Sequence, residues 1–299
     1  MKLSLHSRPA RTAAVAIASA AAGIALAVPG LAIAAHGHHS VSAPPVHPTS
    51  ASQIQNIDQV KTAIKAYYGD TVTSVPDPVP NGQDAAVLGD SATTMLHQFS
   101  PDSAYAHEVE RIANRAGRAL GHPKPSAHKA VLFDIDDTTL NTYSYEIYSN
   151  FVYNPTTNGY FVNAGSASVF PAVPGMVSLE KKAIRKGYTV FFLTGRPTSQ
   201  VTGTLANLRD AGYTVNDANV FLKDASAATE PWLASCVDHS TTPATFTCNT
   251  IQYKSMTRRY IEKKLGYDIV SNFGDQFSDL KGGFANRTYK IPNPMYYLP

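Results

Sequence analysis

Short apolar runs alternate with amphipathic helical patterns through the second half of the chain. Four of these runs are rich in β-branched and aromatic residues, as strands buried on both faces are. They span Ala130–Asp134, Tyr188–Leu193, Asn219–Leu222 and Asp268–Phe273. Helical patterns lie between them at Gly175–Lys186, Ser199–Ala211 and Lys254–Leu265. The alternation predicts an α/β fold, a doubly wound parallel sheet with helices on both faces.

The first 52 residues have a different composition and are not predicted to belong to this fold. Lys2, Arg8 and Arg11 precede an Ala-rich apolar run that ends in small residues, as the cleavage sites of signal peptides do. We therefore predict a signal peptide over residues 1–34, cleaved near Ala34, so that the secreted chain has no stable membrane association. A retained anchor is the alternative, because the run is about as long as a membrane span. Residues 35–52 are rich in His, Pro and Ser and predict a disordered linker.

Residues 53–125 are predicted to form an N-terminal helical segment in front of the main domain, residues 126–299. Apolar residues recur every three or four positions in Gln53–Tyr68 and again in Tyr105–Leu120, which is helical spacing. The stretch between these helices predicts a loop. The residues that indicate this loop are Pro76, Pro78, Pro80 and Gly82.

Charge and cysteine content limit the partners and the redox chemistry. The chain has 25 Lys and Arg against 22 Asp and Glu, a formal net charge of +3. This excess is too small and too scattered for a nucleic-acid partner. Cys236 and Cys248 are the two cysteines, twelve residues apart. In a chain predicted to be exported they predict a disulfide, with two free thiols as the alternative.

Three carboxylates follow the first strand directly, in the phrase Phe133-Asp-Ile-Asp-Asp-Thr-Thr-Leu140. In extended backbone, Asp134 and Asp136 point to the same side. Two such carboxylates repel each other unless a cation or a shared proton lies between them, so the pattern favours a metal. Taken alone, the stretch is also typical of a solvated turn or a helix cap. A helix-loop-helix calcium site is excluded, because Thr139 and Tyr145 stand where it needs Gly and Glu.

Polar residues also follow the later strands. The phrase Leu193-Thr-Gly-Arg196 ends the second strand, and such a turn with its hydroxyl and amide groups suits a phosphate. Lys254 is predicted at a helix start, and Asp275 and Asp279 follow the last strand four residues apart. Each motif alone is compatible with ordinary turns and caps. In an open parallel sheet, however, ligands gather at the carboxyl ends of the strands, where all these residues are predicted.

In this order and placement, the motifs resemble the haloacid dehalogenase (HAD) superfamily of phosphohydrolases. Within it, the chain is most similar to subfamily IIIB, the class B acid phosphatase group that includes plant vegetative storage proteins. The resemblance covers about residues 100–299. It implies a HAD-like Rossmannoid sheet with an N-terminal helical appendage and a small or absent cap. The phrases that carry it are Phe133–Leu140, Leu193–Arg196, Tyr253–Ser255, Gly274–Asp279 and Ile291–Pro299.

The resemblance implies a Mg²⁺-dependent acid phosphatase that acts on small phosphomonoesters. Asp134 is then the nucleophile that forms an aspartyl-phosphate. Asp136 is the acid that protonates the leaving oxygen and later the base for water.

The resemblance also implies binding and supporting residues. Substrate phosphate is expected to contact Thr194, Gly195, Arg196 and Lys254. For Arg196, a surface salt bridge is the alternative. Mg²⁺ is expected to bind Asp134, the backbone carbonyl of Asp136, and Asp275. Thr138 and Asp279 are expected to support the site, with Asp279 orienting Lys254 or a metal-bound water.

Substrate scope depends on what covers this site. Asn141–Pro174 and Ala225–Thr250 are too short for an independent cap, so an open site for varied small phosphomonoesters is predicted. Phosphotransfer to an alcohol on the same scaffold and a non-catalytic storage or binding protein are the alternatives. A group of aromatic residues predicts either a wall that stacks the substrate or core packing. They are Tyr143, Tyr145, Tyr148, Phe151 and Tyr153.

Overall fold

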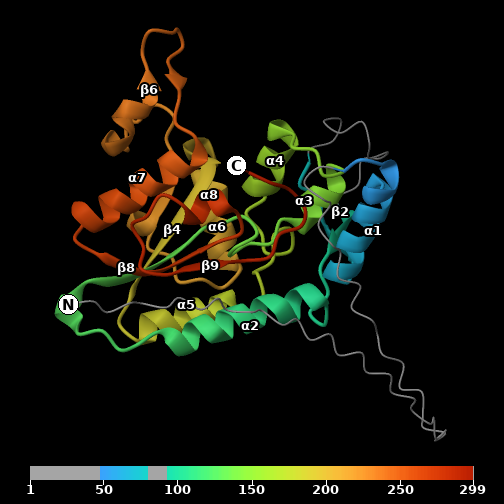
Figure 1. The fold of residues 1–299 in the computed structure, drawn as a ribbon, viewed down its shortest axis with the longest axis horizontal. Coiled ribbons are helices and arrows are strands. Elements are labelled where there is room, and N and C mark those ends of the chain that lie inside the picture. Colours follow the sequence, from blue (N-terminus) through green and yellow to red (C-terminus); the bar gives the residue numbers. More distant parts are fainter. Residues whose placement is uncertain (1–47, 80–92, 299) are drawn as a thin grey trace, which may run out of the picture. The chain divides into compact units, whose positions relative to one another are not determined.

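A five-stranded sheet forms the centre of the protein (Figure 1). The computed structural model describes residues 48–79 and 93–298, so the predicted signal peptide and most of the predicted linker lie outside it. The strand order is β5-β4-β3-β8-β9, and every neighbouring pair is parallel. The strands are β3 (Lys129–Phe133), β4 (Thr189–Pro197), β5 (Val220–Lys223), β8 (Asp268–Gly274) and β9 (Thr288–Lys290).

The predicted parallel sheet is confirmed, and all four predicted strands are present. The main difference is in β4, which continues to Pro197 rather than ending in a turn after Leu193. Strand β9 was not predicted, because three residues are too few to show a periodic pattern. Among the described helices, none is long and apolar enough to cross a membrane.

The two faces of the sheet have separate hydrophobic cores, because successive side chains of a strand point in opposite directions. Val131 and Phe133 of β3 belong to the cluster that includes residues of α2, α5 and α6. Ala130 and Leu132 belong to the second cluster, which includes residues of α7. Helices therefore cover both faces, as predicted (Figure 1). These helices are α2 (Ala104–Ala119), α5 (Met176–Arg185), α6 (Val201–Asp210) and α7 (Thr250–Lys263).

The segment in front of the sheet contains two predicted helices and a strand pair that was not predicted. Helices α1 (Ile57–Tyr68) and α2 lie where the periodicity places them. Between them, β1 (Thr71–Pro76) and β2 (Thr93–Gln98) pair antiparallel. The prolines there favoured a loop; Pro80 and Gly82 lie outside the described residues.

This segment shares its core with the sheet. Tyr68 of α1 and Val109 of α2 are fully buried and belong to the same hydrophobic cluster as Val131 and Phe133 of β3. The described residues also fall within one compact unit. A division of the chain near residue 125 stays a prediction about its organisation.

Two short insertions lie near the carboxyl ends of the strands. The first holds α3 (Tyr143–Tyr148) and α4 (Pro155–Asn163). The second holds a helical turn at Pro231–Cys236 and the strand pair β6 (Val237–Asp238) and β7 (Thr245–Phe246). Both insertions are described throughout and neither forms a domain of its own, as the prediction of a small or absent cap requires.

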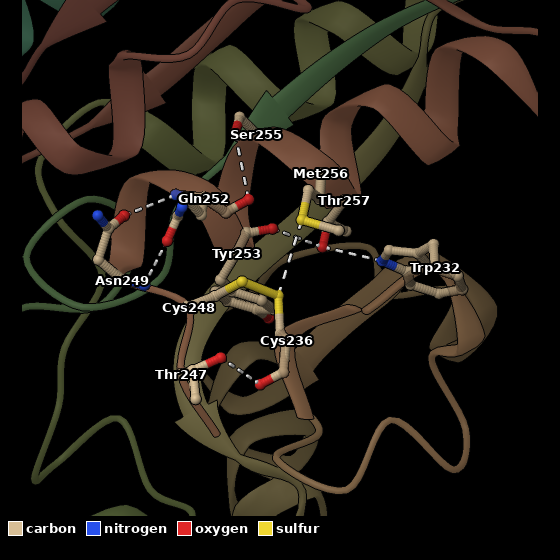
Figure 2. Close-up of a disulfide and its surroundings, with 10 residues drawn as sticks. All are labelled: Trp232, Cys236, Thr247, Cys248, Asn249, Gln252, Tyr253, Ser255, Met256 and Thr257. Atoms are coloured by element: carbon tan, nitrogen blue, oxygen red, sulfur yellow. Dashed lines mark hydrogen bonds between the residues drawn. A yellow bond between two sulfur atoms is a disulfide. The ribbon is translucent and has the colours of Figure 1, made fainter. Parts of the chain in front are cut away.

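The second insertion is closed by the predicted disulfide between Cys236 and Cys248 (Figure 2). Cys248 directly precedes Asn249, whose side chain caps α7 by accepting a hydrogen bond from the Gln252 amide at 2.9 Å. Gln252 accepts in return from the Asn249 amide at 2.9 Å. The disulfide therefore anchors the insertion to the first turn of α7.

Candidate active site

The carboxyl ends of the three central strands bring the predicted site residues together. Asp134 follows β3, Thr194 lies near the end of β4, and Asp275 follows β8. Since β3 lies between β4 and β8, the three residues meet at one edge of the sheet. Lys254 enters from α7, and its ammonium donates to Asp134 Oδ1 at 2.5 Å.

Lys254 lies on the second turn of α7 and not at the helix start that the sequence predicts. The helix begins four residues earlier, after the reciprocal cap formed by Asn249 and Gln252. The added turn contains Ile251 and Tyr253, and the Asn-x-x-Gln pattern in front of it was the available signal for the helix start. From this position the buried ammonium reaches the carboxylates of Asp134 and Asp279.

Asp279 has both of its carboxylate oxygens engaged. Oδ1 accepts a hydrogen bond from the Lys254 ammonium, and Oδ2 accepts one from the backbone amide of Gln276 at 2.8 Å. A Cβ atom on Gly274 would lie 2.3 Å from the Asp279 Cβ, so this approach requires glycine at the end of β8. The geometry supports Asp279 as the residue that orients Lys254.

A second cation of α7, Arg258, holds the backbone next to Asp279. Arg258 is fully buried, and its Nη1 donates to the carbonyl of Asp279 at 2.7 Å. Nε donates to the carbonyl of Gly283 at 2.8 Å, and Nη2 donates to that of Lys281. Arg258 lies four residues after Lys254 and therefore on the same face of α7. The sequence did not indicate this role of Arg258, because its partners are backbone carbonyls and not acidic side chains.

Burial and crowding raise the pKa values of the carboxyl groups at this edge. Burial and the nearby Asp279 hold the pKa of Asp134 well above its ordinary value, although the Lys254 ammonium opposes this shift. Burial likewise raises the pKa of Asp137 to about 7 and that of Asp275 to about 7. Burial alone lowers the pKa of Lys254, but the carboxylates of Asp134 and Asp279 outweigh it and the pKa is raised. The site therefore carries unfavourable negative charge that a bound cation relieves.

The carboxylate cluster fits a divalent metal ion. Ligand oxygens of Asp134, Asp275 and Asp279 lie within 4.8 Å of one another, and all three residues are buried. Carboxylate oxygens are the donors that Mg²⁺ prefers. Because both oxygens of Asp279 are engaged, Asp134 and Asp275 are the better pair of ligands. The Asp136 carboxylate lies outside this cluster, and its expected contribution is the backbone carbonyl.

The Asp136 carboxylate is paired with Arg196. Arg196 Nη2 donates to Asp136 Oδ1 at 2.6 Å, and Nε donates to both oxygens at 3.0 and 3.1 Å. The buried guanidinium also donates to the Thr204 hydroxyl at 3.0 Å. Arg196 is thus in a salt bridge, as one of the two sequence-based alternatives had it, but with a buried guanidinium rather than on the surface. Its position supports a role in holding Asp136 as well as the phosphate.

Thr194 and Gly195 border the same space from β4. The Thr194 hydroxyl lies 3.4 Å from Asp136 Oδ2 and accepts from the Arg196 amide at 3.1 Å. Apart from Gly195 itself and its two chain neighbours, no heavy atom of the described chain lies within 4 Å of the place where a Gly195 Cβ would stand. A phosphoryl oxygen therefore has room beside this backbone. The predicted helix N-terminus is farther away, because α6 begins only after a short 3₁₀ turn.

Buried polar contacts fix the loop that follows β3. Asp137 has a positive φ of 52° and accepts from the Thr142 amide at 3.0 Å and from its hydroxyl at 2.5 Å. The Thr138 hydroxyl donates to Asp275 Oδ1 at 3.3 Å, which supports the expected role of Thr138. Glu146 on α3 is also buried, and burial followed by nearby acidic groups raises its pKa to about 8. Asp137 is thus engaged by contacts within the loop.

Two residues of segment 291–298, which follows β9, reach the site and were not predicted. The Asn293 amide nitrogen donates to Asp275 Oδ2 at 2.7 Å. The Tyr296 hydroxyl donates to Asp137 Oδ2 at 2.8 Å. The segment belongs to a phrase that carried the family resemblance, but nothing in its residue types indicated contact with the acidic cluster.

Most of the predicted aromatic wall is core. Tyr143 and Tyr145 are buried, and Tyr148 and Phe151 pack against the same hydrophobic cluster. Tyr153 differs, because the residue is 69% exposed. Core packing is therefore the better interpretation for the first four residues, and Tyr153 is the most exposed of the five.

These features define an α/β protein with a candidate phosphoryl-transfer site. The chain belongs to the HAD superfamily, subfamily IIIB (acid phosphatase), whose family model matches residues 87–299. The membership expected from the sequence motifs is confirmed.

Plant proteins are among the relatives. Acid phosphatase 1 of Solanum lycopersicum is 31% identical over 212 residues, which are 68% of this chain and 73% of that protein. The stem 28 kDa glycoprotein of Glycine max is 33% identical over 59% of this chain and 61% of its own length. Vegetative storage protein 2 of Arabidopsis thaliana is 31% identical over 56% of each chain. The chain thus spans less than two thirds of the length of the latter two relatives.

A solved structure is similar at lower identity. The class C acid phosphatase from Bacillus anthracis with tungstate bound matches 66% of this chain and 82% of that chain. The TM-score is 0.47 and the sequence identity is 20%.

Proposed function

We propose that the protein is a Mg²⁺-dependent acid phosphatase that hydrolyses small phosphomonoesters through an aspartyl-phosphate at Asp134. The observation that carries this proposal is that the carboxylates at the sheet edge form two separate groups. Asp134 and Asp275 lie in a buried cluster with Lys254, whereas Asp136 stands apart on Arg196. Family membership as an acid phosphatase supports the same reaction.

Phosphoryl transfer needs the substrate charge neutralised before an anionic nucleophile can attack. Mg²⁺, when bound by Asp134 and Asp275, supplies positive charge to the phosphoryl oxygens. Lys254 fixes Oδ1 of Asp134, and within the described residues no hydrogen bond to Oδ2 is found. We assign the attack on phosphorus to Oδ2, which forms the new O–P bond as the ester O–P bond breaks.

Asp136 is the proposed acid and base. It protonates the leaving oxygen in the first step and takes a proton from the attacking water in the second. Its carboxylate is partly exposed, so leaving group and water both have access. The fork of Arg196 holds the carboxylate in one orientation.

The phosphate is held by Thr194, Gly195 and Lys254 in this proposal. The Thr194 hydroxyl and the open backbone beside Gly195 face the space next to Asp136. Lys254 adds a fixed positive charge between nucleophile and phosphate. Arg196 contributes charge while it holds Asp136.

We further propose that the protein is exported after cleavage near Ala34. The disulfide between Cys236 and Cys248 supports this, since disulfides persist in oxidising compartments.

The test is release of phosphate from para-nitrophenyl phosphate, with Mg²⁺ and with excess EDTA. We expect release that stops in EDTA and is abolished by Asp134→Asn. The matched control is Asp268→Asn, at the opposite end of the sheet, where the carboxylate pairs with Lys129 on the surface. This control is expected to keep its activity.

Each alternative has its own outcome. No release from folded, Mg²⁺-loaded protein, with nucleotide and sugar phosphates tried as well, would favour the storage protein. Transfer of phosphate to an added alcohol would favour a phosphotransferase. Full activity in excess EDTA would remove the metal from the mechanism.

A further inference from the structure

The carboxylate of Asp275 is held by neutral amides on one side only. Oδ2 accepts hydrogen bonds from the side-chain amide nitrogens of Asn293 and Gln276, each at 2.7 Å. Oδ1 accepts only the longer hydrogen bond from the Thr138 hydroxyl at 3.3 Å, among the described residues. The two oxygens are thus unequal, and Oδ1 is the one left for another ligand.

The orientation of the Asn293 amide is fixed by its own contacts. Its oxygen accepts a hydrogen bond from the backbone amide of Met295 at 2.8 Å. An oxygen in the other position would face the Asp275 carboxylate and repel it, so the nitrogen must point to Asp275. Asn293 therefore acts as a donor of defined direction.

Segment 291–298, which carries Asn293, is anchored along its length. Ile291 and Met295 are buried in the main hydrophobic cluster. Near its far end, the Leu298 amide donates to the Gln276 side chain at 3.1 Å, and the Ser278 hydroxyl donates to the Leu298 carbonyl at 3.1 Å. This anchoring holds Asn293 against Asp275.

We propose that Asn293 is a positioning residue for the metal ligand Asp275, and that segment 291–298 forms the outer layer of the metal site. The proposal rests on the metal dependence proposed above. Neutral amide donors orient a carboxylate without cancelling its charge, so Asp275 keeps its full attraction for a cation. They also pin Oδ2, which leaves Oδ1 facing the site.

The test measures Mg²⁺ binding to metal-free protein by titration calorimetry, a readout that does not depend on activity. Loss of a hydrogen-bond partner behind a metal ligand typically weakens metal affinity by about 10- to 100-fold. We expect an effect of this size for Asn293→Ala, and a smaller one for Asn293→Ser, which keeps a hydroxyl donor. Activity of both variants should return to that of wild type when Mg²⁺ is raised in proportion, with KM for the ester unchanged.

The matched control is Asn286→Ala. Asn286 also donates from its side chain to an aspartate, Asp268, at 2.8 Å, but on the protein surface away from the site. Its Mg²⁺ affinity should equal that of wild type.

Two results would overturn the proposal, and they are distinguishable. Equal Mg²⁺ affinity of wild type and the Asn293 variants removes the positioning role and leaves the metal-dependent reaction standing. Absence of Mg²⁺ binding by wild type itself removes both. If Asn293→Ala does not fold, Asn293→Ser provides the test. The shift of its unfolding curve on addition of Mg²⁺ reports its Mg²⁺ affinity.

Discussion

The two cation–carboxylate pairs of the site differ in their access to water. Lys254 pairs with Asp134 and Asp279, and all three side chains are 7% exposed or less. Arg196 is as deeply buried, but the Asp136 side chain that it holds is 30% exposed. The proposed nucleophile, Asp134, is thus fixed in a closed environment, while the proposed acid and base, Asp136, faces the open side.

The difference matches the demands of the two proposed steps. A nucleophile benefits from low dielectric surroundings and a fixed direction of attack. A general acid must meet leaving groups of varied shape and later a water molecule. The compact ammonium of Lys254 suits two carboxylates at once, whereas the planar fork of Arg196 suits one carboxylate bound through both oxygens.

The largest effect is expected at the closed pair. Lys254→Met leaves Asp134 and Asp279 buried without their counter-charge, which typically costs about 3–5 kcal/mol of stability. It should also lower kcat by about 100- to 1000-fold, the loss typical of one electrostatic donor. Denaturant unfolding in EDTA and steady-state kinetics with Mg²⁺ measure the two effects. A variant as stable as wild type would contradict the description of Lys254 as the buried counter-charge of Asp134 and Asp279.

The disulfide anchors the same side of the site and gives the next effect. Replacing both Cys236 and Cys248 by Ser reopens a loop whose closure contributes about 3 kcal/mol in the chain-entropy model. Unfolding curves should show this loss, while the folded variant keeps most of its activity because the cap of Asn249 and Gln252 remains. Loss of activity in folded protein would show that the disulfide positions Lys254.

At the more exposed pair, Arg196 and Asp136, the substitution Arg196→Lys keeps the positive charge but loses the guanidinium that binds both carboxylate oxygens. General acid catalysis contributes most for poor leaving groups, so the kcat loss should be larger for an alkyl phosphate than for para-nitrophenyl phosphate. We expect a loss of about 10-fold or more with the alkyl ester. The kinetics of both esters measure it. An equal loss with both would mean that Arg196 serves the phosphate and not Asp136.

The smallest effect on activity is expected at Glu146, which has no role in the proposed mechanism. Its pKa is raised from 4.5 to about 8, first by burial and then by Asp137 and Asp136. The folded state then holds this proton at pH values where the unfolded state has lost it. The contribution of Glu146 to stability is therefore largest below about pH 4.5 and is lost as pH rises toward 8. Glu146→Gln removes this penalty and should stabilise the protein at pH 8, with little change at pH 4. Thermal unfolding at the two pH values measures it, and equal gains at both would be inconsistent with a titrating Glu146.

The parts of the fold and site that follow from local patterns could be predicted. Buried strands show as apolar runs, and the residues after them must meet at one sheet edge, which placed Asp134, Thr194 and Asp275 together. Lys254 was recognised by its motif, but its predicted place on the helix was wrong, because the capping pattern of Asn249 and Gln252 that marks the helix start was not used.

The remaining contacts could not be predicted, because they join distant segments through groups without a pattern. Arg258 binds backbone carbonyls, which every residue has. Asn293 meets Asp275 only because segment 291–298 returns along the sheet edge. The strand pair β1–β2 is short and partly composed of turn-forming residues, so its pairing depends on tertiary contacts.

Helix α7 also limits where the length of the chain can vary. Lys254 and Arg258 work from one helical face, and each residue of an α-helix turns the chain by about 100°. Inserting one residue between them would rotate Arg258 away from the carbonyls that it holds while Lys254 stays in place. The tip between β6 and β7, a few residues upstream, is exposed and is expected to tolerate added length. Relatives of different size are therefore expected to differ at that tip and to keep the four-residue spacing on α7.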